Sequence, residues 1–195
     1  MTHPFPRERR FAEHLAGLAI RANEGNSDAR AALAALRRGL GKEPGEVAEV
    51  AQQVMPWIGE HDRTDTVAAY FQIAALFAGH RGSWQHTDGE RLTNLGASFR
   101  RLAGPPGGPD ESGPERRFVA LLNAHPDDLD RHVRHAVSLL KSDVIPVDWA
   151  QLLRDIQEWT HEARRVQRAW ARAFWGSGYS AEAEAAPAHT EATPG

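Results

Sequence analysis

The clearest periodic pattern of this chain lies near its end, between Asp148 and Trp175. Large apolar residues recur there at intervals of three and four, as on the buried face of a helix. They are Trp149, Leu152, Leu153, Ile156, Trp159, Val166, Trp170 and Phe174, with Ala163 and Ala173 in the gaps. Asp148 is suited to cap the first turn, and Gly176 follows the last turn. The pattern predicts one long helix over 148–175, the spine of a helical bundle.

The same spacing predicts seven further helices. Gly, Pro, Asn and Asp residues, which cap or stop helices, stand between them. The expected helices are Glu8–Asn23, Asp28–Leu40, Glu46–Met55, one opening at Asp62 or Thr64, Asp88–Leu102, Pro114–Ala124 and Asp128–Lys141. No segment alternates convincingly with a period of two, so no strand is expected. The predicted fold class is all-α, with about five helices, a linker and then three more.

A segment rich in proline and glycine, Gly104–Pro114, interrupts the helices. Its four prolines and four glycines cannot continue a helix and are typical of a linker. It lacks the Gly-Lys-Ser/Thr ending and the preceding strand of a phosphate-binding loop. We therefore expect two small helical bundles joined by a Pro/Gly-rich linker. The expected divisions are an N-terminal bundle over 1–103, the linker over 104–114, a C-terminal bundle over 115–179 and a disordered tail over 180–195.

Composition narrows the class of protein. The chain has 195 residues, of which 41% are hydrophobic, and a formal net charge of −3, so it is not basic as a whole. It has no cysteine, which excludes disulfides and thiol chemistry. No apolar run approaches the roughly 20 residues of a membrane span, and Met1–Arg10 lacks the apolar core of a signal peptide. We expect a soluble, cytoplasmic protein with no membrane partner.

Candidate catalytic and metal-binding patterns are incomplete. His132 and His135 are three residues apart, and Glu158 and His161 have the Glu-x-x-His spacing of di-iron bundles. Such a site needs a second Glu-x-x-His element and two more glutamates, which we do not find. No Gly-x-Ser-x-Gly motif is present. The sequence therefore predicts no catalytic residue, no metal and no cofactor.

Arginine, by contrast, recurs on several predicted helices, and only Lys42 and Lys141 among the basic residues are lysine. The clusters are Arg30/Arg37/Arg38, Arg116/Arg117, Arg131/Arg134/Lys141 and Arg164/Arg165/Arg168/Arg172. Each cluster alone is typical of a solvated surface. Together they indicate a track for phosphates, which arginine binds in bidentate fashion. Arg116 and Arg117, at the expected start of a helix, would oppose its dipole and so favour a functional role.

Several segments resemble one known family. The segments are Asp28–Gly39, Glu115–Leu122, Asp128–Arg134, Leu139–Ser142 and Val147–Ile156 followed by Trp159. In these segments the chain is similar to the small subunit of the type I-E CRISPR Cascade complex, the CasB family. The Val-Asp-Trp element at 147–149 is the most specific, where the family has Leu-Asp-Trp. The resemblance covers about 28–175.

The resemblance implies a non-catalytic, basic subunit present as two copies in an RNA-guided antiviral complex. Its partners would be the other Cascade protein subunits, the guide RNA, the target strand and the displaced non-target strand of the R-loop. Positions that match basic residues of the family are Arg37, Arg38, Arg63, Arg116, Arg117, Arg134, Arg164 and Arg165. With Arg131 and Lys141 from the clusters above, they form the expected nucleic-acid-binding set.

Two alternatives remain open from the sequence. In the first, the arginines make salt bridges to other proteins and the chain is a scaffold. The salt dependence of binding to single-stranded DNA separates this from nucleic-acid binding. In the second, the chain is a metal-binding helical-bundle enzyme, which elemental analysis of the purified protein would test.

Overall fold

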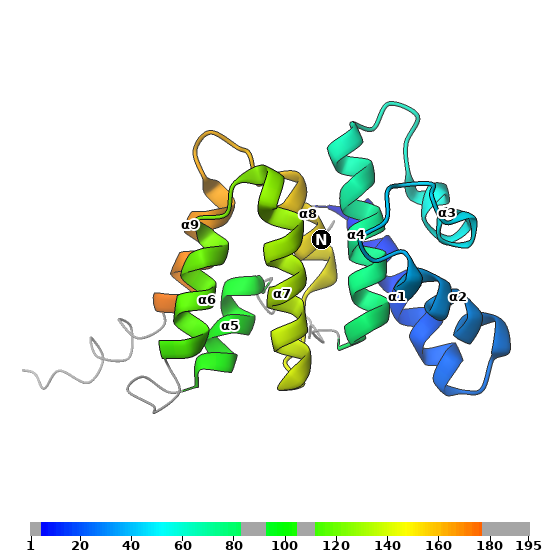
Figure 1. The fold of residues 1–195 in the computed structure, drawn as a ribbon, viewed down its shortest axis with the longest axis horizontal. Helices are drawn as coiled ribbons and strands as arrows, with labels where there is room; N and C mark the ends of the chain where they lie inside the picture. Colours follow the sequence, from blue (N-terminus) through cyan, green and yellow to red (C-terminus); the bar gives the residue numbers. More distant parts are fainter. Residues whose placement is uncertain (1–4, 83–92, 105–111, 177–195) are drawn as a thin grey trace, which may run out of the picture.

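The computed structural model describes residues 5–82, 93–104 and 112–176. Every regular element in these ranges is helical, which confirms the predicted all-α fold (Figure 1). The α-helices are α1 (Pro6–Asn23), α2 (Ser27–Arg38), α3 (Ala48–Val54), α4 (Thr64–His80), α5 (Leu95–Ala103), α6 (Ser112–Leu122), α7 (Leu129–Ser142), α8 (Trp149–Gln157) and α9 (Arg165–Trp175). Two 3₁₀ turns, η1 (Met55–Trp57) and η2 (Pro126–Asp128), lie between them.

Helices α1 to α4 pack together on one side of the molecule, at the right in Figure 1. Phe11 of α1 is fully buried there and packs against Tyr70 of α4, with 4.9 Å between the ring centroids. Leu33 and Leu36 of α2 are also fully buried. The side chain of Asn26 accepts a hydrogen bond of 2.8 Å from the amide of Ala29 and caps α2. These apolar faces are the ones that the sequence pattern indicates.

Helices α5, α6, α7 and α9 form the other side, and an aromatic column joins three of them. Helix α8 packs against α1 and α4. Phe118 of α6 packs between Phe99 of α5, at 5.3 Å, and Phe174 of α9, at 4.5 Å. Helix α5 comes before the expected linker, yet it packs against α6 and α9, which follow it. The division at 104–114 stays a prediction. Its residues 105–111, the expected helix start at 88–92 and the expected tail at 180–195 lie outside the described residues.

The two sides share one hydrophobic core, which passes through α8. Trp149 of α8 is 3% exposed and packs against Phe77 of α4, with ring centroids 5.6 Å apart. Its indole Nε1 donates to the carbonyl oxygen of Gly82 at 3.0 Å. A second link joins His80 Nε2 and the carbonyl oxygen of Ile145 at 2.6 Å. These contacts bury Trp149, a residue of the predicted apolar stripe, where the two groups of helices meet.

The prediction of one spine helix over 148–175 is wrong, because the chain reverses between α8 and α9. The apolar stripe has no large residue between Trp159 and Val166, and Ala163 is exposed. Arg164 takes the left-handed conformation, with φ at 47°. The reversal brings Trp170 of α9 against Trp159, with ring centroids 5.2 Å apart. Folding back buries both indoles against each other, which a straight helix could not do.

Helices α5 and α9 cross at very short distance. Gly96 of α5 lies directly against the backbone of Trp170, and a Cβ added to it would stand 2.1 Å from the Trp170 carbonyl oxygen. Only glycine allows two helix backbones to approach this closely. The crossing fixes α9 against α5 and fixes the orientation of the arginines on the outer face of α9.

Candidate nucleic-acid interface

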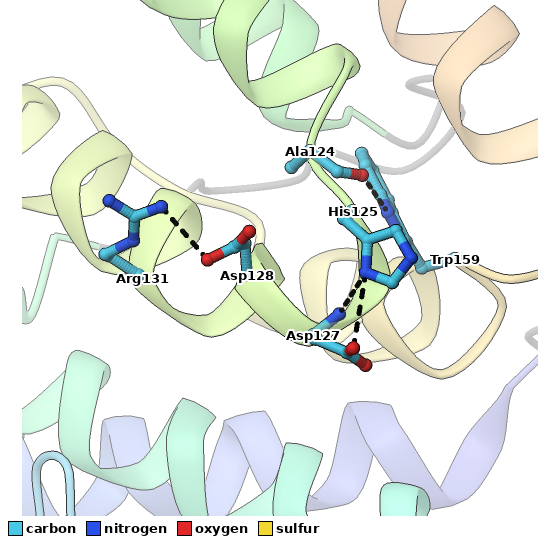
Figure 2. Close-up of polar contacts among 6 residues, drawn as sticks. All are labelled: Ala124, His125, Asp127, Asp128, Arg131 and Trp159. Carbon is cyan, nitrogen blue, oxygen red and sulfur yellow. Dashed lines mark hydrogen bonds and ion pairs between the residues drawn. The ribbon is translucent and has the colours of Figure 1, made fainter.

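Three of the ten expected binding residues already pair with carboxylates of the chain. Arg63 Nη2 lies 2.6 Å from Asp65, and Arg134 Nη2 lies 2.7 Å from Asp130. Arg131 Nη2 lies 3.0 Å from Asp128 in the turn between α6 and α7 (Figure 2). The three pairs are on the surface, where such a contact contributes about 0–1 kcal/mol. A phosphate can therefore replace the carboxylate at little cost.

Two further expected residues hold the reversal between α8 and α9. Arg164 Nη2 donates to the carbonyl oxygen of Leu122, the last residue of α6, at 2.8 Å. Arg165 contacts Nε2 of His161 one turn away. Arg164 thus satisfies one of the free carbonyls at a helix C-terminus. Its guanidinium serves the fold, which the sequence analysis did not foresee.

The remaining five residues make no ion pair within the part of the chain that the structure describes. They are Arg37, Arg38, Arg116, Arg117 and Lys141, and all five are exposed. Arg37 donates from Nε only to the carbonyl oxygen of Leu33 in its own helix, at 3.4 Å. These five cations have the least competition from the chain itself for an incoming anion.

The dipole argument for Arg116 and Arg117 does not hold. Helix α6 begins at Ser112, two residues before the expected start, so both arginines lie in its second turn. The dipole acts mainly within the first turn of a helix. Their functional interest rests on their lack of a carboxylate partner.

The fold gathers part of the set into two areas. The guanidinium of Arg134 on α7 lies over Gly41, 3.1 Å from where a Cβ would stand, and this places the loop after Arg37 and Arg38 against α7. In the second area, α6 and α7 lie side by side (Figure 1). Arg117 of α6 and Ser142, the residue after Lys141, line the same cavity there. Arg63 at the start of α4 is not joined to either area by any contact within the described ranges.

The turn between α6 and α7 is held by polar contacts to its neighbours, as Figure 2 shows. The indole Nε1 of Trp159 donates to the Ala124 carbonyl oxygen at 3.4 Å. The amide of Asp127 donates to Nδ1 of His125 at 3.3 Å. These contacts position Asp128 and so the pair that it makes with Arg131.

A buried carboxylate, that of Asp155, links α8 to α9. Asp155 of α8 is 5% exposed and accepts hydrogen bonds from Trp170 Nε1 at 2.5 Å and from Gln151 Nε2 at 2.8 Å. Burial raises the pKa of Asp155 from its ordinary 3.8 to about 7, although the two hydrogen bonds act in the opposite direction. Sequence reasoning missed this residue, although its place three residues after Leu152 puts it on the buried face.

The residues considered for a metal site have other roles in the structure. Glu158 pairs with Arg154, and His161 contacts Arg165, both at the reversal. His132 and His135 line the cavity beside Arg117. Within the described ranges no three His, Asp or Glu side chains are grouped as metal ligands.

Comparison with known proteins decides the family. The family model for CRISPR-associated protein Cse2 matches residues 32–175. The chain belongs to the Cse2 family. A Cse2 protein of Thermus thermophilus is 34% identical over 153 residues, which cover 78% of this chain and 83% of the relative. This confirms the resemblance that the sequence segments indicate.

Solved structures agree with this Cse2 assignment. The crystal structure of M. ruber CasB matches with a TM-score of 0.70 and 31% identity, over 92% of this chain and 98% of that one. A chain of a CRISPR RNA-guided surveillance complex matches with a TM-score of 0.67 and 26% identity, over 90% and 99%. In the part of this Cse2 chain that the structure describes, no helix is long and apolar enough to cross a membrane.

Proposed function

We propose that this Cse2-family chain is a non-catalytic, nucleic-acid-binding subunit of an RNA-guided CRISPR surveillance complex that acts in antiviral defence. Its family and its likeness to a chain of such a complex support the assembly. The five exposed cations without a carboxylate partner in the described ranges carry the binding part of the proposal. In this role the chain contacts other Cascade subunits, a second copy of itself, the guide RNA, and both the target and non-target DNA strands.

The proposed contacts are to phosphates and not to bases. Arginine presents a planar group of donors that fits a phosphate in bidentate fashion, and such contacts carry no sequence information. Replacing a DNA duplex by a guide–target heteroduplex is nearly balanced in free energy, so modest contacts to the displaced strand favour the open state. Because the whole chain has a net charge of −3, binding depends on local clusters and on the neighbouring subunits.

The expected residues divide into three roles in this proposal. Arg37, Arg38, Arg116, Arg117 and Lys141 meet the strand directly. Arg63, Arg131 and Arg134 exchange a surface carboxylate for a phosphate when the strand binds. Arg164 and Arg165 support the turn that carries them.

The test is salt-titrated binding of target DNA to the assembled complex that carries Arg37→Ala and Arg38→Ala together. Losing two single-strand phosphate contacts makes the log-affinity against log-salt slope shallower by roughly 1.4, at about 0.7 per phosphate. The loss is similar for unrelated DNA sequences. The thermal midpoint stays nearly constant, because surface changes remain within about 0.5 kcal/mol.

Arg9→Ala with Arg10→Ala is the matched control. It removes the same charge from two neighbouring exposed arginines of α1. A slope that is unchanged at positions 37 and 38, or that changes equally in both double variants, would contradict the proposed contact.

A scaffold role is the second candidate, and Val144 favours it. This valine, in the turn after α7, is 81% exposed and has a φ of 57°. A β-branched residue in the left-handed region is strained, and such strain is often kept for a function. If Val144→Gly releases the chain from the complex while the arginine variants leave the salt slope unchanged, the scaffold role replaces the nucleic-acid role.

A further inference from the structure

A cavity of about 450 Å³ opens between α5, α6 and α7. Arg117 and Ala120 of α6 form one wall, and α7 forms the other through His132, His135, Ala136, Ser138, Leu139 and Ser142. The fully buried ring of Phe99 from α5 closes the floor. Its volume lies within the range of about 300–1,000 Å³ that is usual for small-ligand sites.

The chemistry of the cavity selects an anion with an apolar part. A guanidinium, two imidazoles and two hydroxyl groups line it, and none of the lining residues within the described ranges is acidic. Arg117 forms no ion pair in the described part of the chain, so no carboxylate of that part competes for its donors. Ala120, Ala136 and Leu139 offer an apolar surface between these polar groups.

The polar residues of α7 that line the cavity are not needed for the packing of the helix. The buried stripe of α7 runs through Leu129, Val133, Val137 and Leu140. His132, His135, Ser138 and Ser142 follow an adjacent face at the same helical spacing and remain partly or fully exposed. Ser142 uses its hydroxyl only locally, for a 3.3 Å hydrogen bond to the Ser138 carbonyl oxygen. The imidazoles have no hydrogen-bond partner among the described residues, which leaves their nitrogens available to a ligand.

We propose that this cavity binds one nucleoside phosphate, with the phosphate at Arg117 and the histidines and the nucleoside over Ala120 and Leu139. Two sources share this chemistry, a free mononucleotide and one unpaired nucleotide of a bound strand. The strand source rests on the proposed function, whereas the free nucleotide does not. Ala120 stands on the wall of the cavity and is exposed, so it can be enlarged without disturbing the core.

The test uses the full chain and follows amide NMR shifts of α6 and α7 with four probes. They are adenosine monophosphate, adenosine, inorganic phosphate and a glutamate-rich peptide. The proposal expects adenosine monophosphate to bind at least about tenfold more tightly than each of the other three, because only it fills both parts of the cavity. Equal binding of the acidic peptide would overturn it, since the cavity would then be a plain electrostatic surface.

Ala120→Phe fills the cavity, and Val119→Phe is its matched control one residue earlier, where the side chain is already 39% exposed and does not line the cavity. We expect Ala120→Phe to weaken adenosine monophosphate binding by about tenfold or more and Val119→Phe to leave it unchanged. Arg117→Gln, which keeps the cavity open, should give a comparable loss with an unchanged thermal midpoint. Equal affinities in all these variants would exclude the site.

A single-stranded oligonucleotide distinguishes the two sources. If Ala120→Phe weakens the oligonucleotide as well, the nucleotide belongs to a strand. If only the mononucleotide is weakened, the cavity is a site for a free nucleotide. If the assembled complex with the wild-type chain binds no strand, while the chain still binds adenosine monophosphate, the proposed function is refuted and the cavity site stands.

Discussion

Gly96→Ala is the substitution for which the structure gives the sharpest expected cost. The new methyl group would stand 2.1 Å from the Trp170 carbonyl oxygen, 2.8 Å from its carbonyl carbon and 2.9 Å from its Cα. All three are backbone atoms, so no side-chain rotation relieves the clash. Real Cβ contacts of this kind are essentially never below 3.0 Å, so α5 and α9 must separate by about 1 Å.

The magnitude follows from two opposing effects. Forcing a methyl group into a packed interior costs typically about 1–3 kcal/mol, and occasionally more. Alanine returns at most about 1 kcal/mol by its higher helix propensity. Because the separation also loosens Trp170 and Phe174, we expect the upper part of the range, a net loss of about 2–3 kcal/mol. For a chain of this length that lowers the thermal midpoint by roughly 4–12 °C.

Thermal unfolding followed by circular dichroism measures the loss. Gly79→Ala is the control, because a Cβ added there meets no atom within 4 Å. It should leave the midpoint unchanged or raise it slightly, by up to about 1 kcal/mol of added stability. If Gly96→Ala and Gly79→Ala have equal midpoints, the close crossing of α5 and α9 is refuted.

Three further substitutions test the reversal and the core behind it. In the native state Asp155 binds its proton more tightly than the ordinary carboxyl, so its favourable contribution is complete below about pH 4 and is lost as pH rises towards 7. Asp155→Asn should therefore gain stability relative to the wild type as pH rises from 4 to 8, and parallel unfolding curves at all pH values would contradict this. Trp159→Ala should cost about 3–5 kcal/mol in denaturant unfolding, as for other buried indoles, whereas a loss below 1 kcal/mol would mean that the ring is not packed. Arg164→Ala leaves the Leu122 carbonyl without its donor and should cost about 1–3 kcal/mol, whereas Arg164→Lys, which keeps the charge, should recover part of this only if the hydrogen bond is what matters.

The sequence pattern predicted most helices because each buries one regular apolar stripe. Phe11, Leu33, Phe118 and Val133 all lie on the faces where the spacing puts them. Asp148 caps α8 as expected, with its carboxylate accepting a 3.0 Å hydrogen bond from the amide of Gln151. Local spacing and capping are encoded within one turn of the chain, so a single sequence contains them.

The reversal between α8 and α9 could not be read from spacing alone. The apolar positions on the two sides of the gap keep a helical interval, and no proline or glycine stands between Trp159 and Val166. What turns the chain is tertiary: the contact of Trp159 with Trp170 and the bond from Arg164 to Leu122. Trp159 and Trp170 lie on opposite sides of the turn, and Leu122 is 42 residues before Arg164. Neither contact produces a pattern in the residues next to the turn.

The candidate site was predictable in composition and not in arrangement. Clusters of arginine are visible in the sequence, but the group with which each arginine pairs in the fold is not always recognisable there. Arg134 and Asp130 are four residues apart and could have been paired from helical spacing, whereas Arg164 is tied to a carbonyl 42 residues away. The cavity beside Arg117 needed the packing of α6 on α7, which no single helix reveals.

The shared core that passes through Trp149 fixes the spacing between the two areas of cations that would contact a strand. Since Trp149 packs against Phe77 and is tied to Gly82, the area with Arg37 and Arg38 cannot slide past the area with Arg117 without breaking buried contacts. The contact of Arg134 with Gly41 ties the loop after α2 to α7 in the same way. For a strand bound as proposed, the fixed interval between the two areas then determines which phosphates of the strand are held.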